Sequence, residues 1–152
     1  MTTTAQIAKH LRDIHFGGNW STSCLKDQLA DINWQQATTQ VHAMNTVATL
    51  VYHMHYYVAA ALKVLQGGPL DAHDKFSFDL PPITCEQGWQ QLQQQVWDDA
   101  HAFATLIEQL PDSILPQPFT DAKYGTYYRN LAGIIEHMHY HLGQLVIIKK
   151  LL

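Results

Sequence analysis

The stretch HMHYHLGQL, residues 137–145, places three histidines within five residues near the C-terminus. An α-helix advances by about 100° per residue, so His137 and His141 lie about 40° apart on neighbouring turns. His139 lies about 200° from each of them and faces another side. If these residues are helical, His137 and His141 can bind one metal ion together, and His139 cannot join them.

The surroundings of this histidine pair indicate a helix at the border of a core. Asn130, Gly133 and Gln144 fall within about 40° of His137, so the histidine face is small or polar. The adjoining arc is apolar and must be buried. It consists of Leu131, Ile134, Ile135, Met138, Leu142, Leu145 and Val146. The pattern predicts a helix from about Thr126 to the C-terminus, with the pair beside the core.

A third histidine is expected from TLVYHMHYYVAA, residues 49–60. His53 and His55 are again about 200° apart, so at most one of them can face the same ion. A small or polar stripe, continuous with the apolar side, lies within about 40° of His53, and His55 lies on the far edge of the apolar arc. This stripe comprises Thr46, Thr49, Tyr57, Ala60 and Val64. His53 is therefore the predicted third ligand.

Three imidazoles from two helices would leave a coordination position open, as in catalytic rather than structural zinc sites. Cys24 and Cys85 are outside both histidine motifs, so a closed site with thiolates is hard to assemble. The alternative is that these histidines are ordinary helical imidazoles, since short motifs also arise by chance.

Four side chains near the histidine faces are candidates for orienting ligands or binding substrate: Thr49, Tyr57, Asn130 and Gln144. No carboxylate is clearly placed as a general base. Glu136 points about 100° away from His137, which indicates a solvated or interface residue.

Composition narrows the classes of protein. Hydrophobic residues make up 47% and charged residues 14% of the 152 residues, which suits one folded domain, residues 1–152, rather than disorder. The net charge of −4 comes without a basic run, so neither nucleic acid nor an anionic membrane surface is an expected partner. No signal-peptide core, membrane-span pattern or CxxC pair is present. A soluble cytoplasmic protein is expected.

The chain divides into helical segments separated by loops. Helical spacing and stop signals predict long helices over residues 3–16, 45–66, 84–110 and 126–152, and a partly helical segment over residues 20–32. Asn45 is the expected N-cap of the second long helix, and Thr84–Gln87 has the form of a capping box. FSFDL, residues 76–80, is a weak strand pattern. These features predict an all-α fold, a four-helix bundle.

Three segments together resemble the DinB/YfiT-like superfamily of metal-dependent proteins. GIIEHMHYHLGQLVIIKKLL, residues 133–152, is similar to its last helix, with the pattern H-x-x-x-H-x-G-Q. NTVATLVYHMHYYVAAALKVLQG, residues 45–67, resembles its second helix, where one histidine precedes an aromatic pair, here Tyr56-Tyr57. FGGNW, residues 16–20, with LKDQLADINWQQA after it, resembles the first loop. The matches cover most of the chain in the expected order.

The resemblance implies an up-down-down-up four-helix bundle that holds a divalent metal, zinc or nickel, on His53, His137 and His141, often as a homodimer. Characterised members include thiol-S-transferases that use low-molecular-weight thiols such as bacillithiol, a mycothiol-dependent maleylpyruvate isomerase and proteins called hydrolases. No motif in this chain maps to a particular thiol.

The expected function is a metal-dependent transferase or hydrolase that acts on a small molecule. The rival expectation is a non-catalytic metal-binding or stress-associated dimer in which the metal supports the fold. A homodimer is also expected from the last helix itself. Tyr140, Ile147 and Leu151-Leu152 make its apolar arc wider than one bundle core needs.

Overall fold

The computed structural model describes residues 1–152, and the chain is helical throughout, with no β-strand. The expected all-α class is therefore confirmed. Four long helices are present: α1 (Thr3–Phe16), α4 (Val47–Leu65), α5 (Glu86–Gln109) and α6 (Tyr127–Lys149). Short helices are α2 (Leu25–Leu29) and α3 (Trp34–Thr38), and the 3₁₀ turns are η1 (Asp74–Phe76), η2 (Asp112–Ile114) and η3 (Ala122–Tyr124).

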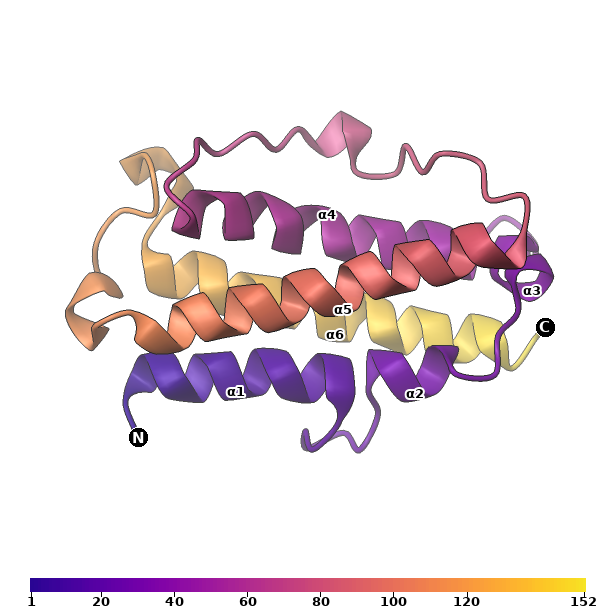
Figure 1. Ribbon diagram of the computed structural model, residues 1–152, viewed down its shortest axis with the longest axis horizontal. Helices are drawn as coiled ribbons and strands as arrows, with labels where there is room; N and C mark the ends of the chain where they lie inside the picture. Colours follow the sequence, from indigo (N-terminus) through magenta and orange to yellow (C-terminus); the bar gives the residue numbers. More distant parts are fainter.

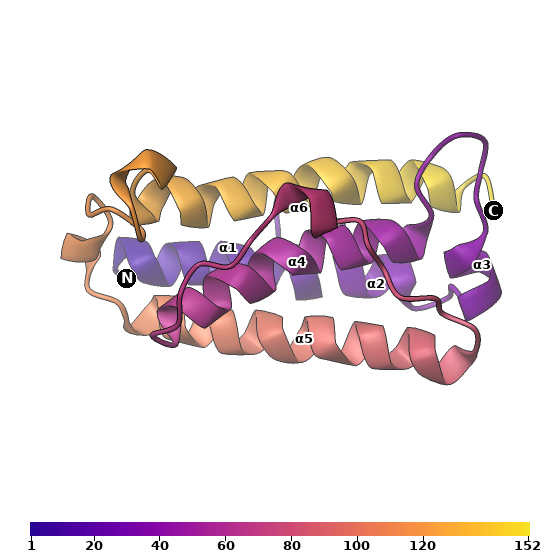
Figure 2. The ribbon, with the colours of Figure 1, turned by 90° about the horizontal axis from the view of Figure 1, so that it is seen from above.

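The four long helices lie side by side along the length of the molecule (Figure 1). Helices α5 and α6 each pack against both α1 and α4. The connection from α4 to α5 does not turn back tightly but runs along the bundle from one end to the other (Figures 1 and 2). This connection carries η1 across the middle of α4, and it contributes directly to the candidate site described below (Figure 2). None of the helices combines the length and apolarity that a membrane crossing needs.

The predicted start of the second long helix is wrong by one residue. The N-cap is Thr46, whose hydroxyl accepts a hydrogen bond from the backbone N–H of Thr49, and Asn45 lies outside the helix. Asn and Thr are both good N-caps, so the residue types alone could not separate them. The start of the last helix is confirmed, because Thr126 caps α6 through the backbone N–H of Arg129.

The predicted capping box at residues 84–87 is also wrong. Helix α5 begins after Cys85, which makes no side-chain cap. The Glu86 carboxylate instead accepts a hydrogen bond, 3.0 Å long, from the backbone N–H of Trp34 at the start of α3. Helix α3 was not predicted, and it carries the real capping box, formed by Asn33 and Gln36.

Residues 76–80 form no strand. Phe76 ends the 3₁₀ turn Asp74–Phe76, and the backbone N–H groups of Ser77 and Asp79 donate turn hydrogen bonds to the carbonyls of Asp74 and Phe76. A strand needs a neighbour with which to pair, and no other segment of this helical chain offers one.

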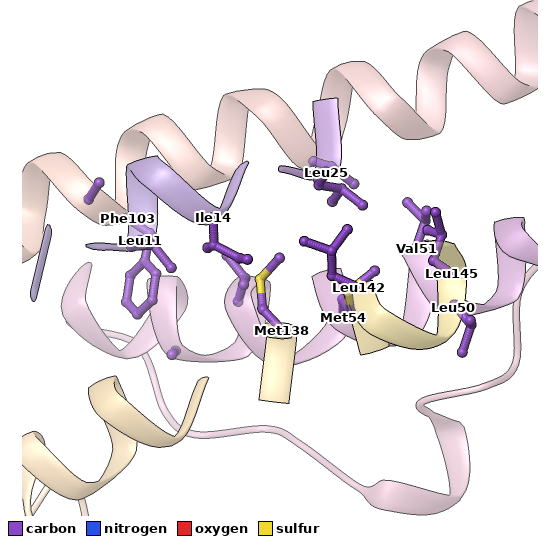
Figure 3. Close-up of a cluster of buried hydrophobic side chains, with 14 of the residues drawn as sticks. Leu11, Ile14, Leu25, Leu50, Val51, Met54, Phe103, Met138, Leu142 and Leu145 are labelled. Atoms are coloured by element: carbon purple, nitrogen blue, oxygen red, sulfur yellow. The ribbon is translucent and has the colours of Figure 1, made fainter. Parts of the chain in front are cut away.

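The core lies between the long helices and includes the apolar arc predicted for α6. Leu131, Met138, Leu142 and Leu145 are at most 3% exposed, whereas Ile134, Ile135 and Val146 pack at its margin. Side chains of α1, α2, α4, α5 and α6 converge in Figure 3, which labels Leu11, Ile14, Leu25, Leu50, Val51, Met54, Phe103, Met138, Leu142 and Leu145. This core holds α4 and α6 together on the side where their histidines meet.

Candidate metal site

The structure brings together the three histidines predicted as ligands. His53 projects from the middle of α4, and His137 and His141 project from successive turns of α6. The ring centroids are 4.8 Å apart for His53–His137, 4.6 Å for His53–His141 and 4.5 Å for His137–His141. One nitrogen from each ring lies within 4.8 Å of the others, which is close enough for one metal ion to bind all three. No carboxylate or thiol completes this group.

Hydrogen bonds set the tautomers of two of these rings. His53 Nδ1 lies 3.3 Å from the carbonyl oxygen of Ser77, which can only accept, so Nδ1 carries the proton. The Ser77 hydroxyl lies 3.1 Å from the same nitrogen and donates its own proton to Asp74 O. His141 Nδ1 donates to Gln144 Oε1 at 2.7 Å. In both rings Nε2 therefore keeps its lone pair for a metal ion.

The third ring, His137, lacks a complete set of hydrogen bonds from the protein. His137 Nε2 lies 2.9 Å from His53 Nε2. Because His53 Nε2 carries no proton, this close approach requires a proton on His137 Nε2 or a cation in its place. His137 Nδ1 is buried and has no hydrogen-bond partner at all. A divalent cation suits three neutral imidazoles arranged in this way.

Burial favours the neutral, metal-binding form of two of these rings, His53 and His137. His53 is 6% exposed and His141 is 8% exposed. Burial, and secondarily the neighbouring histidines, lowers the pKa of His137 from 6.5 to about 4. The pKa of His53 is lowered by the same two causes, burial first and His141 second. At neutral pH the pair is therefore ready to donate lone pairs rather than to repel a cation.

Aromatic rings enclose the histidines. Phe78 stacks on His53 with 3.8 Å between centroids, and Tyr57 meets the rings of His53 and His137 edge-on at 5.4 and 5.0 Å. Tyr140 meets His141 edge-on at 4.9 Å. This enclosure lowers access of bulk water to the group, which strengthens electrostatic interactions within it.

A cavity opens beside His137. Its volume is about 330 Å³, and it adjoins a larger one of about 580 Å³ through shared lining residues. The residues common to both are Tyr57, Tyr124, Asn130 and Ile134. Arg129 lines the smaller cavity and has no acidic partner in the chain, while Leu70 and Phe119 give the larger one an apolar wall. These dimensions suit a small molecule.

The four candidate accessory residues have different positions. Gln144 orients His141, and Tyr57 lines the cavity with its hydroxyl donating to Asp74 at 2.8 Å. Asn130 also lines the cavity, with its amide nitrogen bound to Tyr124 O and Thr126 O. The Thr49 hydroxyl pairs with that of Thr46 at the start of α4 and lines neither cavity.

His55 and His139, which were predicted not to be ligands, lie outside the group of three histidines. His139 is exposed on α6. His55 is not at an outer edge, however, because its Nε2 pairs with Asp99 of α5 at 2.7 Å and its side chain is only 12% exposed. The prediction placed His55 from the pattern of α4 alone, which contains no information about the carboxylate on α5.

Three residues that contact the site from the connection between α4 and α5 were not predicted from the sequence: Asp74, Ser77 and Phe78. No spacing rule marks loop residues of this kind, and the weak strand pattern pointed away from them. We compared the chain with protein-family models, with curated proteins and with solved structures, and none of the three comparisons found a match.

Proposed function

We propose that this protein binds a divalent metal ion through His53, His137 and His141 and uses it in catalysis on a small molecule. The observation that carries the proposal is the convergence of three imidazoles, two of them buried, beside a cavity, with no fourth protein ligand. Imidazole donors suit zinc or nickel, and a site with three protein ligands is typical of catalytic rather than structural zinc. The reaction class is transfer of a low-molecular-weight thiol or hydrolysis.

A bound metal would either lower the pKa of a water molecule or hold a substrate thiol as thiolate. The chain's own residues have separate tasks. Ser77 and Gln144 fix the tautomers of His53 and His141, and Asp74 holds the Tyr57 hydroxyl at the cavity wall. Arg129, which has no acidic partner, offers a cationic contact for a polar or anionic part of the substrate. The apolar wall of the larger cavity would contact the apolar part of the substrate.

We also propose a family and a helix topology for this chain. The H-x-x-x-H-x-G-Q pattern of the last helix supports membership of the DinB/YfiT-like superfamily and, with it, the up-down-down-up bundle. The geometry adds a role for the glutamine of that pattern, because Gln144 is the acceptor for His141 Nδ1.

A second candidate function is a non-catalytic protein in which the metal supports the fold. One observation favours it: the three histidines belong to two different helices, so a bound ion would tie α4 to α6. Removing the metal separates the two candidates.

Chelation is the direct test. We expect the metal-free protein to keep its helical circular dichroism, because a core cluster of 28 buried residues lies outside the histidine group. Activity toward a panel of thiols with electrophiles and of hydrolysable esters and amides should disappear and return when zinc or nickel is added back. Unfolding on chelation, with no activity in the loaded protein, would favour the structural role instead.

The Gln144 contact predicts a measurable loss of metal affinity. Replacing Gln144 with Ala removes the acceptor that orients His141, and groups in this position are typically worth about 10–100-fold in affinity. Competition with a chelating indicator dye would measure the change, with Thr49→Ala as control because the Thr49 hydroxyl pairs with Thr46 and hydrogen-bonds none of the three histidines. Equal affinities for the two variants would contradict the role given to Gln144.

A further inference from the structure

The smaller cavity beside His137 runs along two turns of α6. Arg129, Gly133 and His137 follow one another at intervals of four residues, and all three line this cavity. Residues at this interval lie on successive turns of a helix, so the backbones of Arg129 and His137 are about 12 Å apart along the axis. A cationic side chain therefore lies at one end of the cavity and a histidine of the candidate metal site at the other, with a glycine between them.

No contact within the chain requires glycine at position 133. A Cβ atom built on Gly133 would meet no other heavy atom within 4 Å, and the backbone there is ordinary α-helix without a positive φ. Glycine destabilises the interior of a helix relative to alanine, and neither packing nor backbone conformation accounts for its presence here. Its missing side chain leaves the wall of the cavity open between Arg129 and His137.

The Arg129 end of the cavity suits an anionic group. The guanidinium has no acidic partner, and its stem lies over Gly125, where a Cβ would be 3.2 Å from Arg129 Cγ. The Asn130 amide nitrogen, in contrast, already donates to two backbone carbonyls. Lys123 lies 4.8 Å from the ring centre of Tyr124, which also lines this cavity. Arg129 is thus the lining residue that can bind a carboxylate or phosphate through paired N–H groups.

The two adjoining cavities differ in charge. In the larger one, Asp74 accepts a hydrogen bond from Tyr57, and Lys75 lines the same cavity, so charges of both signs are present. In the smaller one, Arg129 is the one lining residue with a formal charge at neutral pH, because burial keeps His137 neutral. The positive charge of the smaller cavity is therefore not offset by a carboxylate in its wall.

We propose that the substrate of the histidine site is an elongated acidic small molecule. Its carboxylate or phosphate group binds Arg129, its middle passes over Gly133, and its reacting group lies beside His137. This inference rests on the function proposed above and adds to it the class of substrate. Arg129 selects for the anion and Gly133 for the length and width of the molecule, so both residues determine specificity without contacting the reacting atoms.

A matched pair of probes tests the requirement for an anion. The probes are ω-mercaptohexanoate and its primary amide, which share a thiol and a chain length and differ in the negative charge. Calorimetric titration should show at least about tenfold tighter binding of the acid, and Arg129→Gln should abolish this preference. Lys150→Gln removes an exposed, unpaired cation just beyond the other end of α6 and should keep it. Equal affinity of the unmodified protein for acid and amide, or no binding of either, would overturn the proposal.

Filling the space over Gly133 tests the path of the molecule. In Gly133→Leu the new side chain enters open space, so circular dichroism and metal content should be unchanged, whereas binding of the acid should weaken at least about tenfold. Gly143→Leu is the matched control, because position 143 is equally open on the same helix but lines neither cavity. Unchanged binding of the acid by Gly133→Leu would contradict the path.

Elemental analysis, with each titration repeated after chelation, separates this inference from the proposed function. The contact with Arg129 needs no metal, so the preference for the acid should persist in the metal-free protein. A protein that holds metal but does not distinguish the acid from the amide retains the metal site and loses the acidic substrate. A protein that holds no metal and still prefers the acid loses the proposed metal function and retains the anion contact.

Discussion

Alanine at His53, His137 or His141 is expected to lower the bound metal from about one ion per chain to less than about a tenth of that. Each substitution leaves two imidazoles, and two ligands hold a divalent ion weakly at micromolar concentrations. The fold should survive, since these rings lie at the edge of the core and the buried cluster remains. The measurement is the metal-to-protein ratio by elemental analysis of protein purified without an affinity tag, with circular dichroism for each variant.

The matched controls are the two remaining histidines of the same motifs. His139→Ala removes an exposed ring from another face of α6 and should leave metal content and stability unchanged. His55→Ala should also leave metal content unchanged. It should nevertheless lower the free energy of unfolding by about 1–3 kcal/mol, because Asp99 loses its half-buried partner. A folded His139→Ala or His55→Ala protein without metal, beside a loaded His137→Ala protein, would refute the assignment of ligands.

Acid should destabilise the metal-free protein through His15. This ring is 1% exposed, its Nδ1 hydrogen-bonds Leu11 O at 2.8 Å, and burial lowers its pKa from 6.5 to about 4. The nearby His55 of α4 and His101 of α5 lower this pKa further. Below pH 6.5 the unfolded chain therefore binds a proton at His15, whereas the folded chain does not bind it until the pH falls to about 4.

This difference in proton uptake determines how the free energy of unfolding changes with pH. Above pH 6.5 His15 contributes no pH dependence, and between 6.5 and about 4 the free energy of unfolding falls as pH falls. The slope is about 1.4 kcal/mol per pH unit and the total about 3 kcal/mol. Urea unfolding at several pH values, in the presence of chelator, would measure it. His137 adds to the slope of the unmodified protein because its pKa is also lowered to about 4.

A pair of variants isolates the part due to His15. His15→Leu should flatten the pH dependence by about 3 kcal/mol between pH 6.5 and 4. Ile14→Val, a buried substitution on the same helix, should lower stability by about 1 kcal/mol at every pH without changing the slope. If His15→Leu and the unmodified protein have parallel pH profiles, His15 is not the buried neutral group described above.

Much of the candidate site follows from local geometry. The rotation per residue of a helix separates His137 and His141 from His139, and His53 from His55, before any tertiary contact is known. The three histidines that the structure brings together are those selected by this rule. Local signals also located α1 and the start of α6, because helix boundaries at Gly17 and Thr126 depend on the conformational preferences of those residues.

Contacts between distant segments could not be predicted in the same way. Ser77 and Phe78 reach His53 from 24 and 25 positions away in the sequence, and Asp99 reaches His55 from 44 positions away. The predicted capping box, Thr84–Gln87, does not form, and the Glu86 carboxylate within it accepts a hydrogen bond from Trp34 N, 52 positions away. A residue type limits which partners are chemically possible, but it does not select among partners that only the packed chain brings near.

The sequence by itself determined which histidines share a helix face, because that depends on covalent spacing and the helical repeat alone. Only the tertiary structure decided that α4 and α6 pack with those faces together, that Ser77 fixes the protonated nitrogen of His53, and that His137 borders a cavity. The physical reason is that packing, burial and cavity walls depend on neighbours in space, and Ser77, Phe78 and the facing helix come to these histidines from distant parts of the chain.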